Sequence, residues 1–143
     1  MAARVLFVCT RNAVRSPMAE ALAKHLQAAG DLRAASFDSA GIDPGLVDGF
    51  AITIMTELGV DLLRHESKDL EDIDPGDVDL IISLSAPATA SAREFVEGCP
   101  DLHLEEWSVE DPSLTEGSRE EQLAAYRRTR DALADKLRQR FSL

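Results

Sequence analysis

The sequence predicts an α/β fold in which four parallel strands form a sheet that helices cover on both faces. Apolar runs of strand length alternate along the 143 residues with segments of helical periodicity, which favours right-handed crossovers between parallel strands. The run at 78–84 is mostly apolar, as in a strand covered on both sides. The length suits one core, and no linker or repeat interrupts it, so we expect a single domain over residues 1–143.

Simple patterns define the elements of the first half. An apolar run that ends at Cys9 predicts a strand, and apolar residues at helical spacing after Pro17 predict a helix that stops at a glycine. After a second strand and an Asp-Pro-Gly turn, an apolar helical stripe ends at Gly59. The expected elements are strands over 4–9 and 34–39 and helices over 17–29 and 47–58.

The second half repeats the alternation. A loop with a short helix at 65–72 and a turn at 74–77 precede the buried strand, and a polar loop at 108–117 precedes a long last helix. Arg130 interrupts the apolar side of that helix, so we expect part of this side to reach water or the arginine to snorkel. The expected elements are strands over 78–84 and 102–107 and helices over 87–96 and 120–141.

The segment that joins the first strand to the first helix carries the chemistry, and it reads Cys9-Thr10-Arg11-Asn12-Ala13-Val14-Arg15-Ser16-Pro17. Ser16 is a good N-cap and Pro17 suits the first helical position, so the loop ends at a helix start, which favours anions. The same field favours a thiolate at Cys9, and the planar guanidinium of Arg15 matches a tetrahedral oxyanion. One loop thus offers a nucleophile, an oxyanion cradle and a charge clamp.

Charge and cysteine content restrict the partners and the compartment. A formal net charge of -11 argues against nucleic acid and anionic membranes, and it leaves the binding of an anion to local donors. We find no signal-peptide pattern and no apolar run that would span a membrane. The two cysteines, Cys9 and Cys99, do not form a disulfide framework, so we expect a cytoplasmic protein.

Four motifs stand in a characteristic order, namely Val8-Cys9-x-x-Asn12-x-x-Arg15-Ser16-Pro17-Met18-Ala19-Glu20, Ser39-Ala40-Gly41, His65-Glu66-Ser67-Lys68 and Trp107-x-x-x-Asp111-Pro112. Over nearly the whole chain they resemble the low-molecular-weight protein tyrosine phosphatase family, which shares its fold with the thioredoxin-coupled arsenate reductases. The resemblance implies a three-layer phosphotyrosine phosphatase I (flavodoxin-like) fold with strand order 2-1-3-4. It places the site at the carboxyl ends of the strands.

The resemblance also implies catalytic roles. Cys9 would attack phosphorus, Arg15 would bind the phosphoryl oxygens, and Asp111 would protonate the leaving oxygen and later activate water, with Glu110 as the fallback acid. Arg11 either steers anions or is simply solvated. The implied phosphate-binding loop further includes Thr10, Arg11, Asn12, Ala13, Val14 and Ser16.

A supporting network is implied around Asn12, which would adopt an unusual backbone conformation. Ser39 and His65 would hold Asn12 from behind, and Ser16 would donate to the Cys9 sulfur. Some arsenate reductases of this fold have an Asp at the position of Lys68 that helps to bind a monovalent cation. We therefore hypothesise that the ammonium of Lys68 replaces that ion and pairs with Glu20, the alternative being a solvated lysine.

Two reactions remain open, because thiolate attack on an oxyanion begins both. Ser85 stands where the resemblance places the first relay cysteine of an arsenate reductase, so a triple-cysteine relay is excluded. A couple with Cys99 or an external thiol system remains an alternative. We predict phosphomonoester hydrolysis through a phosphocysteine, without metal or cofactor, on a phosphate-bearing small molecule or phosphoprotein. A binding module for arsenate or phosphate without turnover is a third, weaker alternative.

Overall fold

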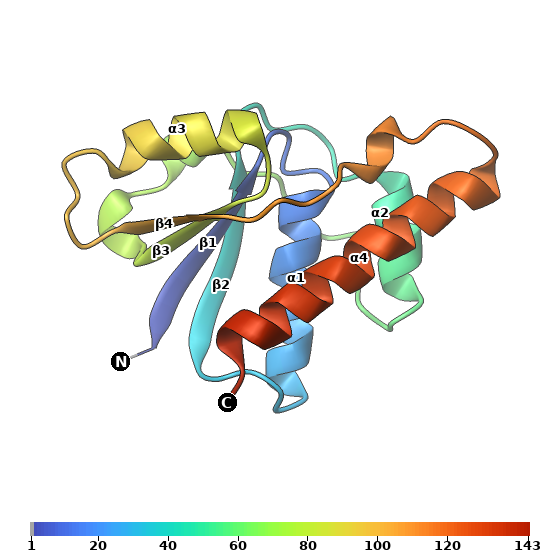
Figure 1. Ribbon diagram of the computed structural model, residues 1–143, viewed down its shortest axis with the longest axis horizontal. Coiled ribbons are helices and arrows are strands. Elements are labelled where there is room, and N and C mark those ends of the chain that lie inside the picture. The colour runs from blue at the N-terminus through green and yellow to red at the C-terminus, as the bar shows by residue number, and fades with distance from the viewer. Residues whose placement is uncertain (1) are drawn as a thin grey trace.

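The computed structural model describes residues 2–143 and has the expected sheet of four parallel strands in the order β2-β1-β3-β4 (Figure 1). The strands are β1 (Ala3–Cys9), β2 (Ala35–Gly41), β3 (Leu80–Ser83) and β4 (His103–Glu106). The helices are α1 (Arg15–Ala28), α2 (Gly49–Thr56), α3 (Ala86–Val96) and α4 (Arg119–Phe141). Three short 3-10 turns lie at Leu70–Asp72, Pro75–Asp77 and Pro112–Leu114.

Both faces of the sheet are covered, as predicted, because alternate residues of β1 enter two different cores. Val5 and Phe7 pack in a cluster with apolar residues of α1 and α4, whereas Leu6 and Val8 pack against α3 (Figure 1). The whole of β3 is buried, as a strand covered on both sides requires. Within residues 2–143 no helix has the length and hydropathy needed to cross a membrane.

The predicted exposure of the last helix near Arg130 is wrong. Only 8% of Arg130 is exposed, because its guanidinium donates to the carbonyl of Ile54 at 2.9 Å and forms ion pairs with Glu57 and Asp131. Glu57 also accepts from Arg127, and these two arginines hold the pKa of the Glu57 carboxyl down at about 2. The charged residue in the apolar stripe therefore joins α4 to the carboxyl end of α2.

The two helices that flank the site begin elsewhere than the sequence predicts. The first starts at Arg15 after Val14, with no side-chain cap, because the Ser16 hydroxyl lies inside the helix and serves the cysteine loop instead. The second starts at Gly49, since the carboxylate of Asp48 accepts from the backbone N–H groups of its first turn.

Candidate functional site

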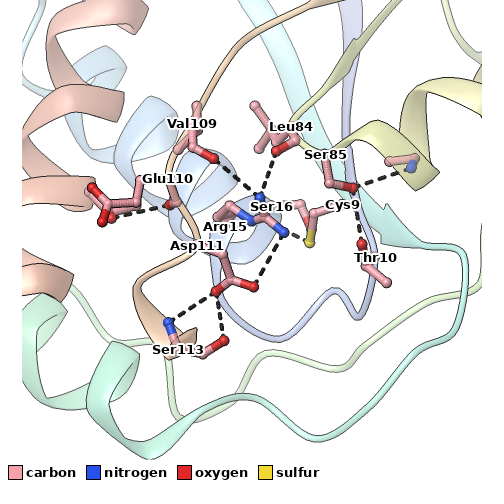
Figure 2. Close-up of polar contacts among 12 residues, drawn as sticks. Cys9, Thr10, Arg15, Ser16, Leu84, Ser85, Val109, Glu110, Asp111 and Ser113 are labelled. Atoms are coloured by element: carbon pink, nitrogen blue, oxygen red, sulfur yellow. Dashed lines mark hydrogen bonds and ion pairs between the residues drawn. The ribbon is translucent and has the colours of Figure 1, made fainter. Parts of the chain in front are cut away.

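A pocket of about 320 Å³ opens where β1 ends, beside Cys9. The cysteine side chain and the loop that follows it form one wall, and Asp111, on the loop after β4, contributes the opposite wall (Figure 2). The lining residues from other segments are Gly45, Leu46, Asp48 and Ser113. The structure thus brings the predicted nucleophile, arginine and acid to one cavity at the expected edge of the sheet.

The carbonyl groups of the loop all bond outward, away from the pocket. The segment 42–48 runs beside the loop and donates its backbone N–H groups to three of these oxygens: Asp43 to Thr10 at 2.9 Å, Gly45 to Arg11 at 2.8 Å and Asp48 to Ala13 at 2.9 Å. The fourth, on Asn12, accepts from the hydroxyl of Ser67 at 2.9 Å. Four successive peptide oxygens are therefore held on the outer side of the loop.

The amide groups of the same peptides face the other way. In a planar trans peptide the N–H points opposite to the C=O, so these four bonds turn the N–H groups of residues 11–14 towards the pocket. Among the described residues none of these four N–H groups has an acceptor. Asn12 has φ of 50°, the left-handed conformation that closes such a concave nest of donors. Unpaired donors with this orientation suit a tetrahedral anion above the cysteine.

The Cys9 sulfur receives donors from the start of α1. The backbone N–H of Ser16 lies 3.4 Å from it and the Ser16 hydroxyl 2.9 Å. The amide nitrogen of Asn12 donates to the same hydroxyl at 2.7 Å, and the hydroxyl proton has two acceptors within reach, the Cys9 sulfur and, at 3.4 Å, the carbonyl of Ala40. These contacts run from Asn12 through Ser16 to Cys9, and the backbone N–H of Ser16 directs a donor at the sulfur.

Asn12 itself is fixed by the predicted partners. It is fully buried, and its amide nitrogen donates to Ser39 at 3.0 Å, while its side-chain oxygen lies 3.1 Å from Nε2 of His65. The Ser39 hydroxyl in turn donates to Glu20 at 2.6 Å. Because the Asn12 oxygen can only accept, Nε2 of His65 carries the proton. The histidine and both serines thus contact the residues predicted for them.

The half-buried position of His65 favours its neutral form. Burial lowers the pKa of the His65 imidazole below its ordinary 6.5, and the nearby Lys68 acts in the same direction, while Glu20 opposes them. A neutral imidazole with its proton on Nε2 still donates to Asn12. The contact therefore does not require a charged histidine.

Arg15 lies over the pocket with its guanidinium anchored on three sides. One nitrogen donates to the carbonyls of Leu84 at 3.0 Å and Val109 at 3.2 Å, and another lies 3.6 Å from a carboxylate oxygen of Asp111 (Figure 2). The second Asp111 oxygen accepts from the backbone N–H and the hydroxyl of Ser113. Arginine and acid therefore meet at the mouth of the cysteine pocket.

The hypothesis of a pair between Lys68 and Glu20 is wrong. The ammonium of Lys68 lies 2.7 Å from Asp38, whereas Glu20 pairs with Lys24, one helical turn further along α1, at 2.6 Å. Lys68 supports the loop through its backbone N–H, which donates to the side-chain oxygen of Asn12 at 3.0 Å. Within residues 2–143 no cluster of three His, Cys, Asp or Glu side chains could hold a metal ion.

Several contributors to the site were not predicted. Ser67 lies in a recognised motif, two residues after His65, yet it had no assigned role. Asp48 is signalled only as an acidic residue before a helix. Its second oxygen accepts from the hydroxyl of Tyr126 at 3.0 Å, and burial together with the Asp48 carboxylate raises the pKa of that phenol. Thr10 and Arg11 were predicted as members of the loop, but their contacts were not: Thr10 contacts the Ser85 hydroxyl at 3.0 Å, and Arg11, mostly exposed, pairs with Asp43 at 3.5 Å.

Cys99 lies at the opposite edge of the sheet from Cys9. It lines a separate pocket with Arg4 and Asp79, next to the amino ends of β1 and β3. Since a strand rises about 3.3 Å per residue, the five steps from Arg4 to Cys9 span about 16 Å. The two thiols are therefore too far apart for a disulfide in this fold.

The fold and the loop together define an α/β protein with a cysteine-containing phosphate loop at the carboxyl edge of a parallel sheet. The sequence profile described as "Low molecular weight phosphotyrosine protein phosphatase" matches residues 4–142. The chain therefore belongs to this family, and the predicted resemblance is confirmed, as is the strand order.

Individual relatives carry two different activities in their names. The chain is 30% identical over 138 residues to the arsenate reductase of Bacillus subtilis (strain 168), covering 94% of this chain and 92% of that protein. It is 36% identical over 109 residues to the glutaredoxin arsenate reductase of Synechocystis sp., covering 76% and 78%. Among solved structures, it resembles YwlE arginine phosphatase, a Cys-to-Ser mutant with a phosphorylated active-site serine, at 28% identity and a TM-score of 0.75, covering 95% and 91%.

Proposed function

We propose that the protein hydrolyses phosphomonoesters through a covalent intermediate on Cys9. The observation that carries this proposal is the position of Asp111, 3.6 Å from Arg15 at the mouth of a pocket that holds one thiol and a row of unpaired amides. Such a pocket supplies a nucleophile, a site for the phosphoryl oxygens and a proton donor for the leaving group.

In the first step the Cys9 thiolate attacks phosphorus. The bond from sulfur to phosphorus forms as the bond from phosphorus to the ester oxygen breaks, and the carboxyl of Asp111 gives its proton to that oxygen. The three non-bridging oxygens take hydrogen bonds from the inward N–H groups of the loop and from Arg15. These donors are fixed before the substrate arrives, so they need little reorganisation as charge develops.

In the second step water attacks the phosphocysteine. The Asp111 carboxylate takes a proton from the water, the bond from phosphorus to sulfur breaks, and the Cys9 thiolate leaves with inorganic phosphate as the product. The Ser16 hydroxyl and backbone N–H, which face the sulfur, stabilise the thiolate as a leaving group. The relative with a phosphorylated active-site serine supports a phosphoenzyme route.

The second candidate is reduction of arsenate to arsenite, which the names of several relatives favour. Cys9 would attack arsenate, and two electrons would then have to come from thiols. The distance between Cys9 and Cys99 leaves an external thiol as the reductant in this fold. The hydrolytic proposal needs no such co-reactant, and for this reason we prefer it.

Parallel assays separate the two reactions. One measures phosphate release from para-nitrophenyl phosphate, and the other measures arsenate-dependent thiol consumption with thioredoxin, glutaredoxin or mycothiol systems. We expect phosphate release that Cys9→Ser abolishes and Cys99→Ser leaves unchanged. Production of arsenite with negligible ester hydrolysis would overturn the proposal, and tight phosphate binding without either reaction would indicate a binding module.

A further inference from the structure

One of the five donors that hold the loop carbonyls outward is a side chain. The other four are backbone N–H groups of the segment 42–48, which any residue except proline provides. Ser67 is therefore the only member of this set that a single substitution can remove without changing the backbone. Its single hydroxyl proton is shared between two acceptors, the carbonyl of Asn12 at 2.9 Å and the carbonyl of Gly45.

The segment that carries Ser67 is held in place beside the loop. Lys68 donates its backbone N–H to the Asn12 side chain at 3.0 Å, and the Lys68 carbonyl accepts from the Gly41 N–H at 2.8 Å. The segment is therefore tied to both the loop and the end of β2. Gly45, its second contact, belongs to the pocket wall. One hydroxyl thus links the loop to the segment 42–48, which also lines part of the cavity.

We propose that Ser67 is a positioning residue that keeps the N–H of Ala13 directed at the bound oxyanion. The Asn12 carbonyl and the Ala13 N–H belong to one peptide, so holding the oxygen outward holds the donor inward. Asn12 is in the left-handed region, which asparagine tolerates better than other non-glycine residues, and its contacts hold it there. Without the hydroxyl this peptide is free to rotate, and the carbonyl that turns inward repels an anion.

The proposal rests on oxyanion binding by the loop, which both candidate reactions share. It deepens the proposed function by assigning a role to a residue that does not touch the substrate. A residue needed only for stability would lower the melting temperature while leaving the affinity of the folded protein for phosphate unchanged. Two measurements therefore distinguish a positioning role from a purely structural one: the affinity for phosphate, and whether the substitution changes kcat more than KM.

The test compares Ser67→Ala with Ser67→Thr, which retains the hydroxyl. Isothermal titration with inorganic phosphate is expected to show about tenfold weaker binding for Ser67→Ala, the loss of one hydrogen bond to a charged group. For hydrolysis of para-nitrophenyl phosphate we expect kcat to fall about a hundredfold, with a smaller change in KM. The threonine variant should restore both. Ser36→Ala is the matched control, because Ser36 is exposed on β2 and its hydroxyl has no bond among the described residues.

Wild-type affinity in Ser67→Ala, or equal loss in the alanine and threonine variants, would overturn the proposal. A second measurement needs no variant: in the wild type, the Ala13 amide resonance should move downfield on titration with phosphate, and an unmoved resonance would also overturn it. A wild type that binds phosphate but hydrolyses no ester would refute the proposed function alone, because the role of Ser67 is read from binding.

Discussion

Replacing Gly41 with alanine should damage the phosphate loop although the change lies on β2. Gly41 pairs with Cys9 at the end of the sheet, and the loop passes directly over it. A Cβ at this position would lie 2.7 Å from the backbone nitrogen of Asn12 and 2.9 Å from the carbonyl carbon of Arg11. Ordinary contacts of this kind begin at 3.4 Å, so the loop must retreat by about 0.7 Å.

The neighbours cannot move aside cheaply, because they are backbone atoms held by the outward hydrogen bonds of the loop. Overpacking of this kind costs about 1–3 kcal/mol of unfolding free energy. A displacement of nearly 1 Å at a reacting centre lowers turnover by about a hundredfold. We therefore expect Gly41→Ala to lose both stability and catalysis.

Urea unfolding and steady-state hydrolysis of para-nitrophenyl phosphate measure the two effects. Gly49→Ala is the matched control, because a Cβ there meets nothing within 4 Å and alanine favours the helix that begins at this residue. The control should keep wild-type turnover and gain up to about 1 kcal/mol. A Gly41→Ala protein with wild-type stability and turnover would refute the close approach described here.

Three further predictions test the acid, the lysine and the histidine. Asp111→Asn should lower kcat for an alkyl phosphate about 10²- to 10⁴-fold without weakening phosphate binding, measured by phosphate release and titration; undiminished turnover would exclude it as the acid. Lys68→Ala should change the unfolding free energy by less than about 1 kcal/mol and leave phosphate affinity intact, because Asn12 is bound by the backbone of residue 68; a large loss of affinity would restore a role for the ammonium. The pKa of His65 lies below 6.5 in the folded state, so on acidification the unfolded chain takes up this proton first and stability declines below about pH 6.5. His65→Gln should flatten this part of the profile, measured by urea unfolding from about pH 5 to 8, and parallel profiles for the two proteins would contradict the assignment.

The sequence predicts the centre of the sheet well because β3 and most of β1 are buried. Continuous apolar runs of strand length, such as that before Cys9, are typical of parallel strands covered on both faces. The helix starts were harder, because local capping rules compete with the needs of the site. Ser16 has the side chain of a good cap, but the site uses its hydroxyl at the cysteine sulfur, and α1 starts without a side-chain cap.

The residues of the site likewise fall into two groups, those that the sequence predicts and those that it does not. Residues that act through a distinctive side chain, such as Cys9 and Arg15, are visible in the sequence because few other arrangements combine a strand, an arginine and a helix start. Contacts made by the backbone are not visible: residue 68 supports Asn12 through its N–H, so its side chain misled the interpretation. Arg130 was misjudged because a charged residue in an apolar stripe gives no sign of distant partners such as Glu57.

The outward bonds of the loop also show how a chain with a net charge of -11 would accommodate the dianion that the proposed function requires. Charges beyond about 8 Å are largely screened at physiological ionic strength, so the local groups decide the field in the pocket. Each peptide whose C=O points towards the segment 42–48 turns its N–H towards the cavity, so the positive end of the peptide dipole faces the cavity instead of the negative end. Arg15 supplies a formal positive charge beside this row of dipoles, Arg11 lines the same pocket, and Asp111 lies at the rim, where the leaving group rather than the phosphoryl oxygens would meet it. The proposed anion binding therefore depends on peptide orientation, which is why substitutions at Gly41 and Ser67, neither of which carries charge, should disturb it.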